Sequence, residues 1–295
     1  KRFHYLYERV SADLARISTF ASEKEIRSYL ESLVARAYGE IHESRSKPHQ
    51  LRPFYWFFTR FPQVFRSRVQ AFWLSLAITL AGVTFGAAVI SFDYDAKPVL
   101  MPFEHLQVKP SQRVQMEEKS KEDRLQGHKG SFSAMLMTHN TKISILTLAL
   151  GMTWGIGTII LLFSNGVMVG AVSADYILDG QTKFLMGWLM PHGVIEIPAI
   201  LIAGQAGILL AGALIGRGNR LSLRLRLREI TNDLLTLIGG VAVLLVWAGI
   251  IEAFLSQYHE PVLPYWAKIT FGFVELVLFV AFLSRGGSSG TKIKD

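Results

Sequence analysis

The sequence contains no cysteine and few charged residues. Of 295 residues, 31 are Lys or Arg and 23 are Asp or Glu, so that charged residues make up 18%, against about a quarter in a soluble domain. The absence of cysteine excludes a secreted scaffold held by disulfide bonds. A hydrophobic fraction of 50% excludes a disordered chain. The charges gather in residues 1–68, 93–142 and 217–233. This distribution indicates an integral membrane protein.

The formal net charge of +8 raises the question of nucleic-acid binding. The excess basic residues, however, flank the apolar segments, where the cytoplasmic ends of membrane helices carry Lys and Arg. No basic stripe with interleaved aromatic residues stands apart from them, as binding to a single strand would require. We therefore expect membrane lipid, and no nucleic acid, among the partners.

Residues 1–53 are expected to form a cytoplasmic helical hairpin followed by a linker. Apolar residues recur at helical spacing in residues 2–20 and again between Ile26 and Ile41, with charges on the opposite faces. Both stretches are too polar to cross a bilayer. Residues 54–68 combine aromatic residues with Arg, which is typical of an interfacial helix that leads into a first membrane span.

Five apolar stretches are long enough to cross about 30 Å of hydrocarbon. They are Val69–Phe92, Ile143–Phe163, Gly193–Gly216, Leu234–Ser256 and Val262–Leu283. Residues 165–190 are also apolar, but the polar residues 179–183 interrupt them. If this region crosses the membrane once, every basic cluster lies on the cytoplasmic side, as the positive-inside rule requires.

We therefore predict an all-α, polytopic membrane helical bundle over residues 69–285, with about six membrane segments of which the third is short or broken. Both termini are then cytoplasmic, and the loop 93–142 is extracytoplasmic. Residues 286–295 are expected to be a flexible tail or a non-native remnant.

Four pairs of glycines spaced four residues apart lie within the apolar segments. Such pairs allow two helix backbones to approach closely inside a membrane. The pairs are Gly82/Gly86, Gly151/Gly155, Gly166/Gly170 and Gly212/Gly216. Four of them exceed what one six-segment bundle needs, so we expect a homodimer.

A polar motif at residues 191–198 is the main candidate for a functional site. His192 and Glu196 are one helical turn apart and share a face. Ionisable residues inside a membrane span normally face the bundle interior or a cavity. Pro191, Gly193 and Pro198 loosen the helix around them.

Three roles are open for this motif: a structural polar contact, a proton- or cation-binding site of a transporter or channel, and the centre of a metal-dependent intramembrane hydrolase. Zinc sites with HExxH spacing bring two His, whereas only one His is embedded here. We therefore predict no catalytic residue, metal or cofactor, and an enzyme is the least favoured of the three.

The predicted functional motif also includes Asn165 and Gly166, and Gln205 and Glu275 are secondary candidates. Asn165, beside Gly166, is expected to cap the start of the short third segment. Gln205 is expected to make an interhelical hydrogen bond. Glu275 lies in the middle of the last span, so its carboxylate needs a partner from another helix.

Several stretches together resemble the stage II sporulation protein M family. They are Leu148–Gly155, the run LLFSNGVMVGA at 161–171, and PHGVIEIPAI at 191–200 with Gly204 and Gly207 after it. Residues 30–38 and the FPxxFR stretch at 61–66 resemble the longer, stand-alone members of the family.

The resemblance implies a multi-pass protein of the bacterial cytoplasmic (inner) membrane that serves as a scaffold or assembly factor for cell-envelope machinery. It also implies a MoxR-type AAA+ ATPase or a peptidoglycan hydrolase as partner. No catalytic activity is attached to the family motif, so the resemblance assigns none to His192 or Glu196.

Overall fold

The computed structural model describes residues 2–19, 24–42, 52–119, 128–216, 221–256 and 262–287. The chain divides into two compact units, residues 1–53 and 54–295. Most of the predicted linker (residues 44–51) and of the predicted tail (residues 288–295) lies outside the described residues.

The first unit is a pair of helices, α1 (Arg2–Thr19) and α2 (Lys24–His42). They pack along each other, with the rings of Tyr7 and Tyr38 at 6.4 Å between centroids. The predicted helical hairpin is confirmed.

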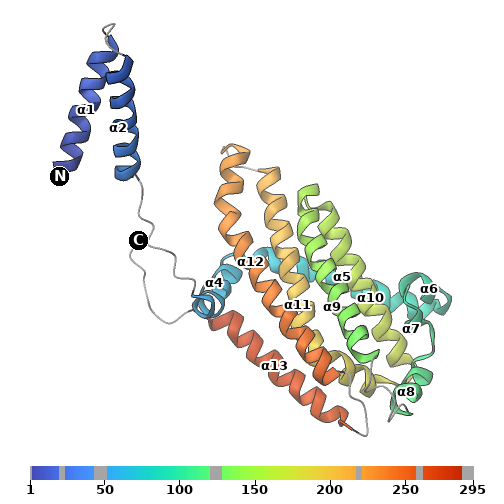
Figure 1. Ribbon diagram of the computed structural model, residues 1–295. Coiled ribbons are helices and arrows are strands. Elements are labelled where there is room, and N and C mark those ends of the chain that lie inside the picture. The colour runs from blue at the N-terminus through green and yellow to red at the C-terminus, as the bar shows by residue number, and fades with distance from the viewer. Residues whose placement is uncertain are drawn as a thin grey trace. The chain divides into compact units, whose positions relative to one another are not determined.

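The second unit is a bundle of long helices (Figure 1). Among the residues that the structure describes, five helices are long and apolar enough to cross a membrane: α5 (Val69–Phe92), α10 (Ile156–Leu178), α11 (Thr182–Ile215), α12 (Leu223–Ile251) and α13 (Tyr265–Arg285). Helix α9 (His128–Ala149) runs beside them and contacts α10, α11 and α12. The chain is thus an all-α, multi-pass membrane protein by its helix composition.

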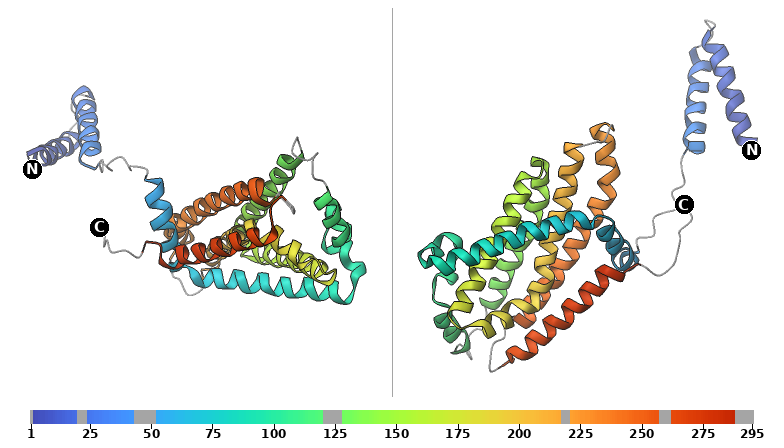
Figure 2. Two further views of the ribbon diagram at one scale, coloured as in Figure 1. Left: turned by 90° about the horizontal axis from the view of Figure 1, so that it is seen from below. Right: turned by 180° about the vertical axis from the view of Figure 1, so that it is seen from behind.

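Shorter elements connect these helices (Figure 2). A short helical stretch precedes α5, comprising α3 (Pro53–Tyr55), η1 (Trp56–Arg60) and α4 (Phe61–Ser67). Residues 93–119, which we call the connecting segment, contain η2 (Tyr94–Ala96), α6 (Lys97–Leu100), α7 (Glu104–Gln107) and α8 (Pro110–Lys119). A 3-10 turn, η4 (Leu150–Thr153), follows α9, and a π-helical turn, η5 (Glu252–Ser256), continues α12.

The predicted span Ile143–Phe163 is wrong, because the chain reverses direction inside it. Helix α9 ends at Ala149, and Trp154 and Gly155 adopt left-handed backbone conformations with φ of 54° and 85°. Left-handed residues cannot continue a right-handed helix. Two helices, α9 and α10, therefore replace the predicted single span.

The predicted short or broken third segment is wrong for the same reason. Its first part belongs to α10, which is continuous over 23 residues. Its last part opens α11, a 34-residue helix that contains Pro191 and Pro198 without interruption. Of the predicted loop 93–142, residues from His128 onward are helical.

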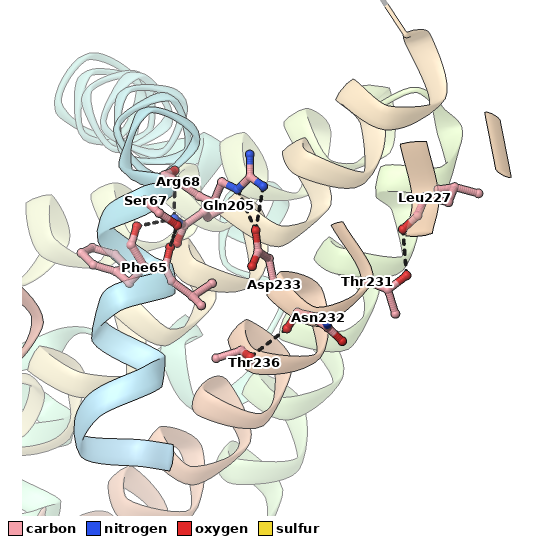
Figure 3. Close-up of polar contacts among 10 residues, drawn as sticks. Phe65, Ser67, Arg68, Gln205, Leu227, Thr231, Asn232, Asp233 and Thr236 are labelled. Carbon is pink, nitrogen blue, oxygen red and sulfur yellow. Dashed lines mark hydrogen bonds and ion pairs between the residues drawn. The ribbon is translucent and has the colours of Figure 1, made fainter. Parts of the chain in front are cut away.

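Polar contacts join the starts of α5 and α12 to the end of α13. Arg68 pairs with Asp233 of α12, Nη2 to Oδ2 at 2.7 Å (Figure 3). Arg66 donates hydrogen bonds to the carbonyl oxygens of Leu283 and Gly286 at 2.7 and 2.6 Å. The basic residues 60–68 and 224–228 therefore lie toward one end of the bundle, as predicted. We call it the Arg68 end, and the opposite end, near the α10–α11 turn, the Asp179 end.

Two of the predicted glycine pairs face each other within the chain. A Cβ added to Gly82 or Gly86 on α5 would overlap with the backbone of Phe163 or Val167 on α10. In return, Gly166 and Gly170 of α10 lie against the backbone of Thr79 and Val83 on α5. We call this contact the glycine seam. At this seam the backbones of α5 and α10 lie in direct contact. Four of the eight paired glycines therefore have their packing partner within the chain, and a second copy is not needed to explain them.

Candidate functional site

Helix α11 carries the predicted motif into the centre of the bundle. His192 and Glu196 are 4% and 9% exposed, and His192 Nε2 lies 3.9 Å from Glu196 Oε2. The helix continues through Pro191 and Pro198 because its neighbours enclose this region, and buried surroundings can satisfy the backbone groups that a proline frees.

A cavity of about 130 Å³ lies beside these two residues. Polar side chains from several helices line it together with apolar ones. The polar lining consists of His139, Asn140, Asn165, Ser173, His192, Glu196 and Glu252. We call it the polar cavity.

Helix α9 supplies a direct partner for Glu196. Asn140 donates a hydrogen bond from Nδ2 to Glu196 Oε1. The neighbouring His139 contacts the ring of Phe103, with 5.4 Å between ring centroids. Because Phe103 and Leu106 of the connecting segment also line the cavity, this segment covers one of its sides.

The C-terminal helices supply two further ionisable groups. Glu252, the first residue of the π-helical turn η5, is 2% exposed and lines the cavity. Its Oε1 accepts no hydrogen bond from any residue that the structure describes. Lys268 of α13 is fully buried and lies close enough to His192 for the two side chains to interact electrostatically. Single π-helical turns are frequent at functional sites.

A buried ion pair and buried hydrogen bonds join the connecting segment to the long helices of the bundle. Lys97 Nζ lies 2.8 Å from Asp175 Oδ2 and also contacts Tyr94 Oη and the carbonyl oxygen of Val108. Burial disfavours the ammonium, but the hydrogen bonds to Asp175 and Tyr94 outweigh it, so the pKa of Lys97 is raised above its ordinary value. Asp175 is only 2% exposed, so this ion pair is buried.

The helix α8 is held by a carboxylate and an aromatic cluster. Asp179 accepts a hydrogen bond from the backbone N–H of Ser111 at 2.6 Å, and the hydrogen bonds from Ser111 lower the pKa of Asp179. Arg113 donates to Tyr176 Oη at 2.7 Å and lies 4.4 Å from the ring centroid of Trp188. These contacts fix the segment that covers the cavity.

The structure brings some of the predicted site residues together and separates others. His192, Glu196 and Asn165 line the polar cavity, and Pro191, Gly193 and Pro198 lie in the same stretch of α11. Asn165 is not a helix cap, because α10 begins nine residues earlier at Ile156. Gly166 belongs to the glycine seam.

Gln205 and Glu275 lie elsewhere. Gln205 donates hydrogen bonds to the carbonyl oxygens of Phe65 and Arg68 at 3.0 and 2.9 Å, where the chain passes from α4 to α5 (Figure 3). Glu275 accepts a hydrogen bond from Trp247 Nε1 at 2.7 Å in a separate apolar groove between α12 and α13. The expected interhelical partners therefore exist, but not at the cavity.

Sequence reasoning missed Asn140, Glu252 and Lys268 as members of the site. Asn140 fell into the predicted loop, since the span was expected to start only at Ile143. Glu252 lies near the end of the predicted span Leu234–Ser256, where an ionisable residue alone gives no signal of a buried site. A usable signal was available: all three are polar residues within or next to apolar stretches.

Comparison with known families identifies the membrane unit. A family model described as stage II sporulation protein M matches residues 75–257, more than half of the chain. The chain belongs to the stage II sporulation protein M family. The matched range contains every residue named above that lines the polar cavity, whereas Lys268 lies beyond it.

Two further matches cover only short stretches of the chain. Residues 1–43 match a second model, described as a domain of unknown function (DUF8413). The chain is similar to the uncharacterized protein MJ0793 of Methanocaldococcus jannaschii, with 37% identity over 73 residues. The match covers 24% of this chain and 41% of that protein, so the chain spans less than half of the relative's length. No solved structure matches the chain.

Proposed function

We propose that this protein is a membrane scaffold or assembly factor for cell-envelope machinery, with the helix pair α1–α2 as the docking element for a soluble partner. The observation that carries the proposal is the surface of this separate unit. Tyr5, Leu6, Ile26, Tyr29 and Tyr38 are between 48% and 61% exposed. A membrane anchor combined with a small exposed interaction unit suits a protein that recruits others.

Elementary energetics supports this role for the helix pair. Two short helices bury too little apolar surface to be very stable alone. Exposed aromatic and aliphatic side chains gathered on a small unit are typical of a protein-binding surface. We infer that a soluble cytoplasmic partner covers them, and a MoxR-type AAA+ ATPase is the proposed partner of the helix pair. A peptidoglycan hydrolase remains a proposed partner for the extracytoplasmic side of the protein.

The test is partner capture by the full chain from native membranes. Ile26 and Tyr29 are three residues apart on α2 and share a helix face. Replacing both with Ser is expected to reduce partner recovery about tenfold, which corresponds to about 1.4 kcal/mol. Arg27→Ala is the matched control, since it removes only the exposed pair with Glu31. Unchanged recovery with the double variant would exclude the helix pair as the docking element.

We further propose that the protein resides in the bacterial cytoplasmic (inner) membrane with both termini in the cytoplasm. Because the sequence contains no cysteine, a single introduced cysteine is the only thiol that a labelling reagent can modify. Ser120→Cys is expected to react with an impermeant thiol reagent from outside, and Ser222→Cys only after permeabilisation. Outside labelling at position 222 would contradict this orientation.

We also propose that the protein forms a homodimer. Fewer glycines are available for this contact than the four pairs in the sequence, because two pairs already face each other within the chain. The glycines of the seam are covered by the chain itself, whereas Gly212 is exposed and a Cβ there would meet no atom within 4 Å. If one of the paired glycines mediates dimerisation, Gly212 is the one open to a second chain, since the side chain of Arg226 lies beside Gly216. Native mass spectrometry from mild detergent, comparing the natural chain with Gly212→Leu, tests this.

A second candidate function is transport or channel activity, and the polar cavity favours it. Buried ionisable groups that line a cavity inside a membrane domain are typical of ion pathways. A flux assay with proteoliposomes distinguishes this function from a scaffold. Flux that disappears in Glu196→Gln while partner capture persists would favour transport.

A further inference from the structure

Two carboxylates from different helices face the polar cavity. Glu196 comes from the middle of α11 and Glu252 from the π-helical turn that continues α12. Both are at least nine-tenths buried, and they are close enough to interact electrostatically. Two ionised carboxylates that share one buried site repel each other.

The groups that surround the pair come from every helix packed against it. Helix α9 provides His139 and the hydrogen-bond donor Asn140, and α10 provides Asn165. Helix α11 provides His192, and α13 places Lys268 close to His192. Among the described residues, Glu252 Oε1 is a buried acceptor without a donor, although it faces a cavity.

The charges of this cluster do not balance. With both carboxylates ionised and both histidines neutral, the residues that line the cavity carry two negative charges and no positive one. Uncompensated charges inside a membrane are strongly unfavourable. One added proton halves this charge and removes the repulsion between the two carboxylates.

We propose that Glu196 and Glu252 form a proton-binding site in which the two carboxylates share one proton. The proton comes from water that reaches the cavity, and binding converts one carboxylate into a carboxylic acid. Paired carboxylates that hold a single proton are a known solution to like-charge repulsion. The site is independent of the scaffold role, and it binds its proton whether or not that proton crosses the membrane.

The residues present favour a proton over a metal ion. Over the described ranges, no group of three or more His, Asp or Glu side chains is placed to hold a metal. A buried ammonium group at Lys268 next to His192 also disfavours a divalent cation. A proton needs only the two oxygens that the pair provides.

Infrared spectroscopy of the protein in lipid nanodiscs tests the proposal through the C=O stretch of protonated carboxylic acids. Glu275→Gln serves as the background, because Glu275 is membrane-embedded but does not line the cavity. In this background we expect a band at neutral pH that corresponds to one carboxylic acid per chain. It disappears when the pH is raised.

Three variants make the expected result specific. Glu196→Gln or Glu252→Gln alone abolishes the band, because the remaining carboxylate no longer faces a second negative charge. Lys268→Met leaves the band in place, because Lys268 does not line the cavity. A band that survives either Gln variant, or that disappears in Lys268→Met, overturns the proposal. A midpoint pH that shifts when sodium replaces choline also overturns it, since sodium would then occupy the site.

A second measurement needs no variant at the pair. Dicyclohexylcarbodiimide modifies protonated carboxyl groups in apolar surroundings, and mass spectrometry locates the modified residue. At neutral pH we expect modification of Glu196 or Glu252, but of only one of them in any chain. Modification of both in one chain, or of neither, overturns the shared proton. Partner capture by the same preparation reports on the scaffold role separately.

Discussion

Two interhelical contacts in the membrane unit are built in opposite ways. At the glycine seam, α5 and α10 touch through their backbones, and an added Cβ has no room. Around the polar cavity, α9, α11 and η5 meet through polar side chains and leave about 130 Å³ between them. Helices α5 and α10 pack directly against each other, and the right view of Figure 2 shows α5 running across the other long helices.

The difference follows from the forces that are available inside a membrane. Lipid chains are as apolar as leucine, so helices associate there through close packing or through hydrogen bonds. The glycine seam uses packing and leaves no group that can change its charge. The polar contacts use groups whose energies depend on protonation and on every partner being present. We therefore expect the seam to resist changes of conditions and the polar contacts to respond to them.

The largest expected effect concerns a polar contact from which one partner is removed. Lys97→Met leaves the buried Asp175 carboxylate without its ion-pair partner, and we expect a loss of about 3–5 kcal/mol of unfolding free energy. The double variant Lys97→Met/Asp175→Leu removes both charges and should recover most of that loss. Thermal unfolding in detergent measures both. Equal destabilisation of the two variants would show that the ion pair itself is not responsible.

The glycine seam should respond to added volume instead. In Gly86→Leu the new side chain collides with the backbone of Val167, so α5 and α10 must separate at a cost of about 3 kcal/mol. Ala88→Leu is the matched control, since it adds a leucine to the same helix at an exposed position. Similar melting temperatures of the two variants would contradict a tight seam.

Hydropathy was sufficient to predict much of this architecture. Long apolar runs are unambiguous, so the all-α membrane class and the separate N-terminal helix pair followed from the sequence. The basic clusters also indicated correctly which segments share an end, as the Arg68–Asp233 pair illustrates. His192 and Glu196 were found because one helical turn separates them, a relation that sequence spacing encodes directly.

Helix boundaries and cross-helix partners were not predictable in this way. The turn at Trp154 and Gly155 is itself apolar, so a hydropathy profile continues across it and merges α9 with α10. The partnership of Glu196 with Asn140 and Glu252 depends on how three helices pack, and no short spacing in the sequence encodes it. The same holds for Gly82 and Gly166, whose partners proved to lie within the chain.

An intermediate effect is expected at Gln205, which joins α11 to the junction of α4 and α5. Gln205→Leu keeps the apolar volume but leaves the carbonyl oxygens of Phe65 and Arg68 without this donor. The loss of two buried hydrogen bonds should cost about 2 kcal/mol. Gln205→Glu offers no N–H group and should cost at least as much. Thermal unfolding of both variants, with Thr270→Val on the exposed face of α13 as the control, measures this.

The smallest expected effect is the loss of a single capping hydrogen bond, whose contribution to stability depends on pH. Asp179 accepts from the backbone N–H of Ser111 in the first turn of α8, so Asp179→Ala should cost about 1 kcal/mol at neutral pH. Because the hydrogen bonds from Ser111 lower the pKa of Asp179 below 3.8, its charge-dependent contribution is present above that pH. It is lost as the pH falls through the lowered pKa. Asp179→Asn retains an acceptor without the charge, and should approach the natural chain in stability as the pH falls. A difference between Asp179→Asn and the natural chain that stays constant down to acidic pH would show that the charge of Asp179 contributes nothing to this contact.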